Sequence, residues 1–334
     1  TSNPISISSK VRRLLSHGDE VLAAALSPDR SKRFAHFSDF VLALGKIHFR
    51  ELRNPGSGSA YQLLQIVGRG GFGEVFKARD RKSGKPVAIK HLLKQGYAER
   101  FRREAKVMAK LVDPCFVRFI EFFETPEAGA FIVMDYLDGM PGNSLRDAIR
   151  RAKGVGLDRK DVLSAFVRYA HGLALMHAGG KDKEPIYHRD IKPSNLYFPE
   201  RRIDNAALMD FGIAKDMGGT MTMAGTVPGT LDYMPPEIVL MESRGDAGVD
   251  IYALGLCLYE ALSGKMAYPR VKDDKSGTIA FMSRATKKLK PNFGDPSVKG
   301  NPEILALLTE MTDPDASKRI SNARELELRI AKIA

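Results

Sequence analysis

Residues 187–195 read Tyr-His-Arg-Asp-Ile-Lys-Pro-Ser-Asn, and no other segment constrains the fold of this chain as strongly. Asp190, Lys192 and Asn195 lie within six positions here, between a helical pattern and the strand-like residues 196–198. An aspartate can accept a hydroxyl proton, a lysine can neutralise a migrating phosphoryl group, and an asparagine carbonyl can ligate Mg²⁺. The segment therefore predicts a loop that carries phosphoryl-transfer chemistry, rather than an ordinary solvent loop.

Residues 68–73 form a glycine-rich segment, Gly-Arg-Gly-Gly-Phe-Gly. Glycines adopt positive φ and let a hairpin backbone approach phosphates without a Cβ clash. The same glycine spacing occurs in dinucleotide-binding folds, where a helix follows the glycines. Here the strand-like residues 74–78 follow, which disfavours a dinucleotide-binding fold. A glycine-rich turn without a function is the alternative.

Two further charged residues suit the same chemistry. Lys90 ends an apolar strand-like run, where a lysine is costly to bury unless it is paired. Glu104, on a helical pattern over 97–111, is the candidate partner, and a surface lysine is the alternative. Asp210 follows the strand-like residues 207–209 and precedes Phe-Gly, which suits a metal ligand on a movable segment. Asp-Phe-Gly alone is also a common turn.

The order of the predicted elements indicates the fold class. Short strand-like runs and one helix fill residues 61–135, and helices dominate from about residue 144. Strands followed by helices predict an α+β fold in two lobes. Before a run of turn residues at 54–59, apolar spacing in 8–26 and 34–52 predicts helices. We therefore expect a helical N-terminal extension and linker over 1–56 and a main domain over 57–334, divided into 57–137 and 138–334.

Composition limits the other classes of protein. The net charge of the 334 residues is +12, but there is no run of five or six like charges, so we expect a basic surface and no nucleic-acid partner. Two cysteines cannot make a disulfide framework. No apolar stretch is long enough to span a bilayer. We expect a cytoplasmic location, with a membrane anchor beyond this sequence left open.

These segments, in this order, resemble the eukaryotic-type (Hanks-type) serine/threonine protein kinases over about residues 61–334. Residues 224–230 look like those of bacterial members. The resemblance implies a two-lobed fold, with a β-rich N-lobe that holds one regulatory helix and a mainly helical C-lobe. It also implies transfer of the γ-phosphate of Mg-ATP to protein serine or threonine hydroxyls, with ATP and Mg²⁺ as cofactors.

The resemblance gives each motif residue a role. Asp190 would be the catalytic base, and Lys192 would neutralise the phosphoryl group. Lys90 would grip the α- and β-phosphates, with Glu104 as its partner. The expected metal ligands are Asn195 and Asp210. The expected ATP contacts are Val67, Gly68, Arg69, Gly70, Gly71, Phe72, Gly73, Val75, Ala88, Lys90, Met134, Asp135, Leu137 and Tyr197.

Structural and regulatory roles follow from the same resemblance. Glu237 would pair with Arg319, and Asp250 would be the buried aspartate that orients the catalytic loop. Thr230 would lie in the P+1 loop that receives protein substrates. The residue types around the catalytic base, Lys192 above all, favour serine or threonine over tyrosine as the acceptor. Three threonines in the activation segment are candidate phosphosites for autophosphorylation, with ordinary flexible-loop residues as the alternative: Thr220, Thr222 and Thr226.

The sequence departs from the family pattern at two places, and two other functions are alternatives to an active protein kinase. Lys90 and Glu104 are 14 positions apart, closer than is usual in the family, so we expect a short connection and a truncated or displaced helix. Residues 1–56 match nothing in the core family and would dock on the small lobe, bind a partner or link to an adjacent domain. A pseudokinase would need a broken motif, and a small-molecule kinase is disfavoured by the P+1-like loop and by Pro-Pro-Glu at 235–237.

Overall fold

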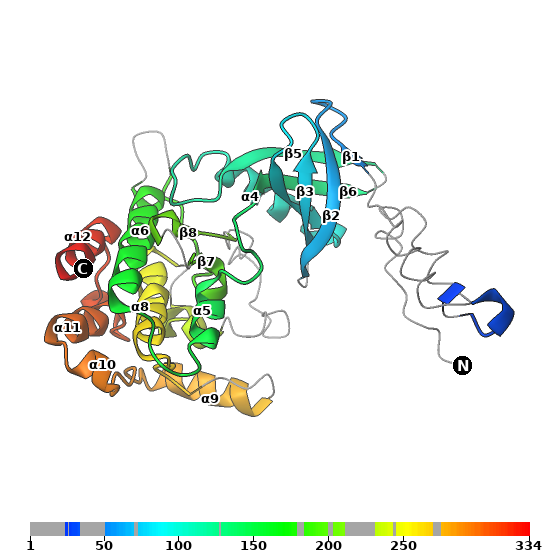
Figure 1. Cartoon of the computed structure of the whole chain (residues 1–334). Helices are drawn as coiled ribbons and strands as arrows, with labels where there is room; N and C mark the ends of the chain where they lie inside the picture. The colour runs from blue at the N-terminus through cyan, green and yellow to red at the C-terminus, as the bar shows by residue number, and fades with distance from the viewer. Residues whose placement is uncertain are drawn as a thin grey trace. The chain divides into compact units, whose positions relative to one another are not determined.

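The chain forms two compact units in the computed structural model (Figure 1). Unit 1 consists of Thr1–Ala105 and Phe119–Tyr136, and unit 2 of Lys106–Arg118 and Leu137–Ala334. Among the helices that the structure describes, none is long and apolar enough to cross a membrane. The described residues are 24–25, 27–33, 51–69, 73–126, 128–178, 184–199, 203–210, 231–242, 245–269 and 275–334.

Unit 1 is built on a six-stranded antiparallel sheet with the strand order β1-β2-β3-β4-β6-β5. One face of the sheet carries the apolar core of the unit, in which Phe76, Ile89 and Phe131 are fully buried. Alternate residues of a strand point to opposite faces, so the other face is left for polar and functional side chains. The strands are β1 (Glu51–Arg53), β2 (Ala60–Arg69), β3 (Gly73–Asp80), β4 (Pro86–Leu92), β5 (Phe119–Thr125) and β6 (Gly129–Asp135).

The first strand corrects one boundary. The helical pattern over 34–52 and the extension over 1–56 placed residues 51–53 outside the sheet, but they form β1 and pair with β2. Leu52 is buried between two exposed neighbours, which is the two-residue period of a strand. Apart from residues 24–25 and 27–33, the rest of the expected helical extension before β1 lies outside the described residues.

Helix α4 (Ala98–Met108) follows β4 after a single 3-10 turn, η2 (Gln95–Tyr97). Phe101, Glu104, Ala105 and Met108 are all buried. Residues three and four apart share one face of a helix, so these four form a single stripe. Glu104 is therefore the carboxylate on an otherwise apolar buried face.

Unit 2 is mainly helical, and α8 (Ala247–Ser263) runs through its interior. Nearly all of α8 is buried, as expected for a helix that is apolar on every side. It begins at Asp246, whose side chain accepts a hydrogen bond from the Gly248 N–H, and ends at Gly264, where φ is +69°. The other helices are α5 (Leu145–Arg151), α6 (Arg159–His177), α7 (Pro236–Val239), α9 (Lys275–Thr286), α10 (Pro296–Lys299), α11 (Pro302–Met311) and α12 (Ala323–Ile333).

A small hairpin in unit 2 holds the segment singled out by the sequence. Strands β7 (Leu196–Tyr197) and β8 (Ala207–Leu208) pair antiparallel. Isolated bridges join Phe116 to Leu208 and Ser144 to Tyr197. The hairpin is thus fixed on both sides, and it determines where the residues just before β7 and just after β8 lie.

Candidate active site

The loop before β7 is anchored by one buried carboxylate, Asp250, in the first turn of α8. Its Oδ2 accepts the His188 N–H at 2.8 Å and its Oδ1 accepts the Arg189 N–H at 2.7 Å. His177 Nε2 lies 2.9 Å from the same Oδ2. Arg189 adopts a φ of +59°, an unfavourable conformation that these bonds hold in place. The expected orienting role of Asp250 is confirmed.

Asp190 lies beside Lys192 and Asn195 of the same loop. Lys192 Nζ is 2.9 Å from Asp190 Oδ2, and Asn195 Nδ2 donates to the same oxygen at 3.0 Å. The Asn195 amide also donates to the Asp190 carbonyl at 2.9 Å. These bonds fix the Asn195 amide nitrogen toward Asp190, so its Oδ1 points elsewhere and accepts from Ser194 Oγ at 3.2 Å. The carboxylate, ammonium and amide groups are therefore held together before any substrate binds.

His188 connects this loop to the segment that carries Asp210. Its Nδ1 accepts the Asp190 N–H at 3.3 Å, and its Nε2 lies 3.0 Å from the Met209 carbonyl oxygen. Burial lowers the pKa of His188, against the raising effect of nearby carboxylates, so the ring is neutral and donates from Nε2. The Met209 N–H donates to the Asn195 carbonyl at 2.9 Å. Asp210 follows directly with a φ of +50°, which turns the chain at the end of the hairpin.

Glu237 and Arg319 form a buried bidentate pair. Arg319 Nη1 and Nη2 lie 2.6 and 3.2 Å from the two Glu237 carboxylate oxygens. The guanidinium also donates to the carbonyls of Gly248 and Asp313 and lies over the Tyr252 ring. This pair was expected and is confirmed, and it ties α7 to the start of α8 and to the chain just before α12.

In unit 1, Lys90 on β4 is paired with Glu104 on α4. The distance from Lys90 Nζ to Glu104 Oε1 is 2.6 Å, and the Glu104 side chain is 6% exposed. The connection is short, as expected, because η2 leads directly into α4. We expected a truncated or displaced helix, but α4 holds Glu104 in direct contact with Lys90.

The face of the sheet opposite the apolar core carries four of the expected ATP contacts. Val75 pairs directly with Lys90, and Ala88 pairs with Met134. Directly opposed residues share a face, and so do residues two apart on one strand, so these four side chains line the same face. Ala88 offers a small apolar contact beside the lysine, which suits a flat ring next to phosphates.

The described part of the glycine-rich segment shows why one glycine is needed. A Cβ at Gly73 would lie 2.3 Å from the His91 carbonyl oxygen, so no larger residue fits there. Of the other expected ATP contacts, Val67, Gly68 and Arg69 end β2, Asp135 ends β6, Leu137 begins the larger segment of unit 2 and Tyr197 lies on β7. Outside the described residues lie Gly70, Gly71, Phe72, Thr220, Thr222, Thr226 and Thr230.

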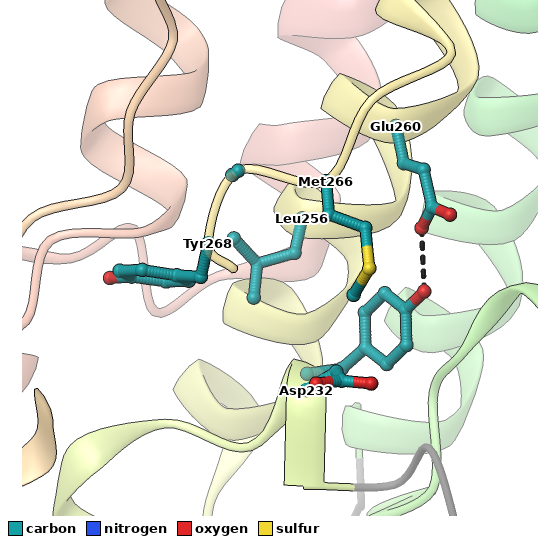
Figure 2. A pocket seen from close by; sticks show the side chains of 7 residues that line it. Asp232, Leu256, Glu260, Met266 and Tyr268 are labelled. Carbon is teal, nitrogen blue, oxygen red and sulfur yellow. Dashed lines mark hydrogen bonds between the residues drawn. The ribbon is translucent and has the colours of Figure 1, made fainter. Parts of the chain in front are cut away.

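A small pocket in unit 2 is lined in part by Asp232 and Tyr233, which come just after Thr230 of the expected P+1 loop in the sequence (Figure 2). The Tyr233 hydroxyl donates to Glu260 Oε2 at 2.5 Å. Burial, with the Glu260 charge, raises the pKa of Tyr233, so the phenol stays neutral and keeps donating. The pocket lining is Asp232, Tyr233, Leu256, Glu260, Met266, Ala267 and Tyr268.

The sequence did not predict two of these contacts. His177 ends α6 and reaches Asp250 across 73 positions, and Tyr233 reaches Glu260 across 27. Neither pair has a characteristic spacing, since each depends on how α6 and the 3-10 turn η7 (Leu231–Tyr233) pack on α8. A buried carboxylate on an apolar helix was the one available signal, because such a group needs a partner.

Comparison with known proteins agrees with this geometry. The family model described as "Protein kinase domain" matches residues 61–328. A serine/threonine-protein kinase from Myxococcus xanthus, pkn2, is 31% identical over 282 residues, which cover 80% of this chain and 31% of that protein. PknB from Mycobacterium tuberculosis, also named a serine/threonine-protein kinase, is 30% identical over 287 residues, covering 82% of this chain and 42% of that protein.

A probable serine/threonine-protein kinase from Bifidobacterium longum is 32% identical over 292 residues, covering 81% of this chain and 39% of that protein. The chain thus spans about a third to two fifths of the length of these curated relatives. The predicted fold class, a β-rich lobe with one helix and a mainly helical lobe, is confirmed. The chain belongs to the protein kinase family and is similar to its bacterial members.

Proposed function

We propose that this chain transfers the γ-phosphate of Mg-ATP to serine and threonine hydroxyls of proteins. The observation that carries the proposal is the group formed by Asp190, Lys192 and Asn195, held within 2.9 to 3.0 Å on a loop fixed by Asp250. Family membership and the names of the relatives support the serine/threonine class.

The chemistry asked of these side chains is positioning and charge stabilisation. The acceptor oxygen forms a bond to the γ-phosphorus as the bond to the bridging oxygen of ADP breaks, and Asp190 takes the hydroxyl proton. Lys192, which is 2.9 Å from Asp190, would then stabilise the negative charge on the transferred group. Lys90, held by Glu104, would bind the α- and β-phosphates.

The metal ligands would be Asn195 and Asp210. An amide carbonyl oxygen and a carboxylate are the donors that Mg²⁺ prefers. The fit rests on the Asn195 amide, whose nitrogen donates twice to Asp190 and so leaves Oδ1 as the oxygen available to a cation. When bound, Mg²⁺ neutralises the phosphate charge and orients the phosphate chain. The expected ATP contacts on β3, β4 and β6 stay a proposal of the same kind.

Autophosphorylation of the activation segment is a further part of the proposal. Within the described part of the chain, Arg189 Nε is buried and has no hydrogen-bond partner. The half-buried guanidinium donates from Nη2 to the Gly245 carbonyl at 3.4 Å, and its open Nε donor suits a phosphate, which accepts charge-assisted hydrogen bonds. The candidate acceptors are Thr220, Thr222 and Thr226.

A labelling experiment tests the activity and the acceptor class together. The chain is incubated with γ-labelled Mg-ATP and a basic protein, and the labelled amino acids are then identified. We expect phosphoserine or phosphothreonine with the wild type and with Lys85→Met, an exposed lysine, but about 100-fold less label with Lys90→Met. Phosphotyrosine as the main product, or equal labelling by Lys90→Met, would contradict the proposal.

A further inference from the structure

A second group of reactive side chains lies in unit 2, outside the catalytic loop. Asp113 and Cys115 lie on the segment between α4 and β5, and His171 lies on α6. One ligand atom from each residue, a carboxylate oxygen, a thiol sulfur and an imidazole nitrogen, lies within 4.8 Å of the other two. The ligand atoms of a tetrahedral metal site are separated by comparable distances, since each lies about 2.0 to 2.3 Å from the ion.

The segment that carries Asp113 and Cys115 lies close to helix α6. Asp113 Oδ1 accepts the Cys115 N–H at 2.9 Å, which fixes the loop, and Asp113 Oδ2 lies 3.7 Å from His171 Nε2. A Cβ at Gly172 would lie 3.2 Å from Cys115 Sγ and 2.8 Å from a Leu208 methyl carbon. The glycine beside His171 therefore allows the thiol to approach the helix.

The histidine ring is oriented from its other side by Glu327 on α12, which packs along α6 (Figure 1). Glu327 Oε1 lies 3.2 Å from His171 Nδ1, and Glu327 Oε2 is paired with Arg324 at 2.6 Å. If Nδ1 donates to this carboxylate, Nε2 presents its lone pair toward Asp113 and Cys115. A carboxylate on the far nitrogen is the usual arrangement around metal-bound histidines.

The charges at the group are compatible with a cation. Burial alone would raise the pKa of Asp113, but hydrogen bonds from Cys115 and the nearby His171 lower it overall, so the carboxylate is ionised. Burial raises the pKa of the Cys115 thiol, which therefore keeps its proton until a metal displaces it.

We propose that Asp113, Cys115 and His171 bind a zinc ion, with Glu327 as the positioning residue for His171. A thiolate, an imidazole and a carboxylate together favour Zn²⁺ over Mg²⁺, and water would complete the tetrahedron. Binding replaces the thiol S–H bond by a Zn–S bond and releases one proton to solvent. The ion would fasten the loop to α6, and the site is independent of the proposed kinase activity.

Cobalt substitution of the whole chain, without nucleotide or magnesium, tests this site. Thiolate-bound Co²⁺ gives an intense sulfur-to-metal absorption band that oxygen and nitrogen ligands do not give. The chain has two cysteines, so Cys257→Ser, on α8, is the matched control for Cys115→Ser. We expect the band to form in the wild type and in Cys257→Ser, with release of about one proton as Co²⁺ binds, and to be lost in Cys115→Ser. One equivalent of Zn²⁺ should then displace Co²⁺ from the wild type and abolish the band.

Variants of the partly exposed residues keep the test valid if Cys115→Ser does not fold. The side chains of His171 and Asp113 are 35% and 29% exposed, so His171→Gln and Asp113→Asn leave the core unchanged. We expect each to weaken zinc binding at least tenfold, and Glu327→Gln by about 10- to 100-fold. No band in the wild type, a band that persists in Cys115→Ser, or unchanged zinc affinity in His171→Gln would overturn the proposal.

Discussion

At the scale of single residues, His188 shows how one neutral side chain can hold the catalytic loop in its conformation through two hydrogen bonds. It accepts from the Asp190 N–H through Nδ1 and donates to the Met209 carbonyl through Nε2. A protonated ring would carry hydrogen on both nitrogens and would meet the Asp190 N–H with another donor. The three carboxylates around it, Asp250, Asp190 and Asp210, favour protonation, but burial prevails and lowers the pKa of His188.

This gives a pH dependence of stability with a defined sign. The unfolded chain binds a proton at His188 near pH 6.5, and because the pKa of the folded ring is lowered, the folded chain binds that proton only at a lower pH, so stability falls as the pH drops through 6.5. We expect the loss of stability to steepen from about 0.7 kcal/mol per pH unit at pH 6.5 toward a limit of about 1.4 kcal/mol per pH unit, which is approached below that pH while the folded ring stays neutral.

Urea unfolding at pH 7.5, 6.0 and 5.0 measures the effect. In the variant His188→Gln, which cannot titrate, the free energy of unfolding should fall less steeply with decreasing pH than in the wild type. The difference in slope should correspond to about one proton fewer taken up on unfolding. A decline of the same slope in both proteins would show that folding does not lower the pKa of His188.

The sequence predicted the residues with a local motif and missed those without one. Asp190, Lys192 and Asn195 lie within six positions, so their proximity follows from one loop. His177 and Glu260 come from the interiors or ends of long helices, and their partners lie far along the chain. Only the packed fold determines those contacts.

At the scale of elements, the charged pairs fix helices to their neighbours. The Glu237–Arg319 pair is buried at both ends and joins α7 to the segment before α12. The Lys90–Glu104 pair joins β4 to α4 through a connection of one 3-10 turn. The types of the elements were predictable from the hydrophobic period, but their boundaries were less so. The helix predicted over 34–52 extends into β1, which starts at Glu51.

Breaking the buried pair should cost far more stability than breaking an exposed one. Arg319→Met leaves the Glu237 carboxylate buried without its partner, and we expect a loss of about 3 to 5 kcal/mol in the free energy of unfolding. The control is Lys318→Ala, which removes an exposed pair with Asp315 at 3.5 Å and should cost less than about 1 kcal/mol. Denaturant unfolding of both variants measures the difference, and similar losses would contradict the assigned role.

At the scale of the whole molecule, the residues proposed to bind ATP and those proposed to act on the acceptor hydroxyl lie mainly in different units. Unit 1 carries Lys90, Glu104 and the strand residues expected around ATP, and unit 2 carries Asp190, Asn195 and Asp210. The change from strands to helices along the chain made this division predictable, and the family match over 61–328 agrees with it. The role of the residues before β1 stays a prediction, because the sequence there matches no motif.

The turnover number of Asp190→Asn tests the central claim most directly. The substitution keeps the shape and the hydrogen bonds of the side chain but removes its capacity to accept a proton. The control is Asp204→Asn, an exposed aspartate in the turn η4 (Ile203–Asn205). With saturating Mg-ATP and a protein substrate, we expect a kcat lower by about 10²- to 10⁴-fold for Asp190→Asn and unchanged for Asp204→Asn. A kcat for Asp190→Asn equal to that of the control would contradict the account.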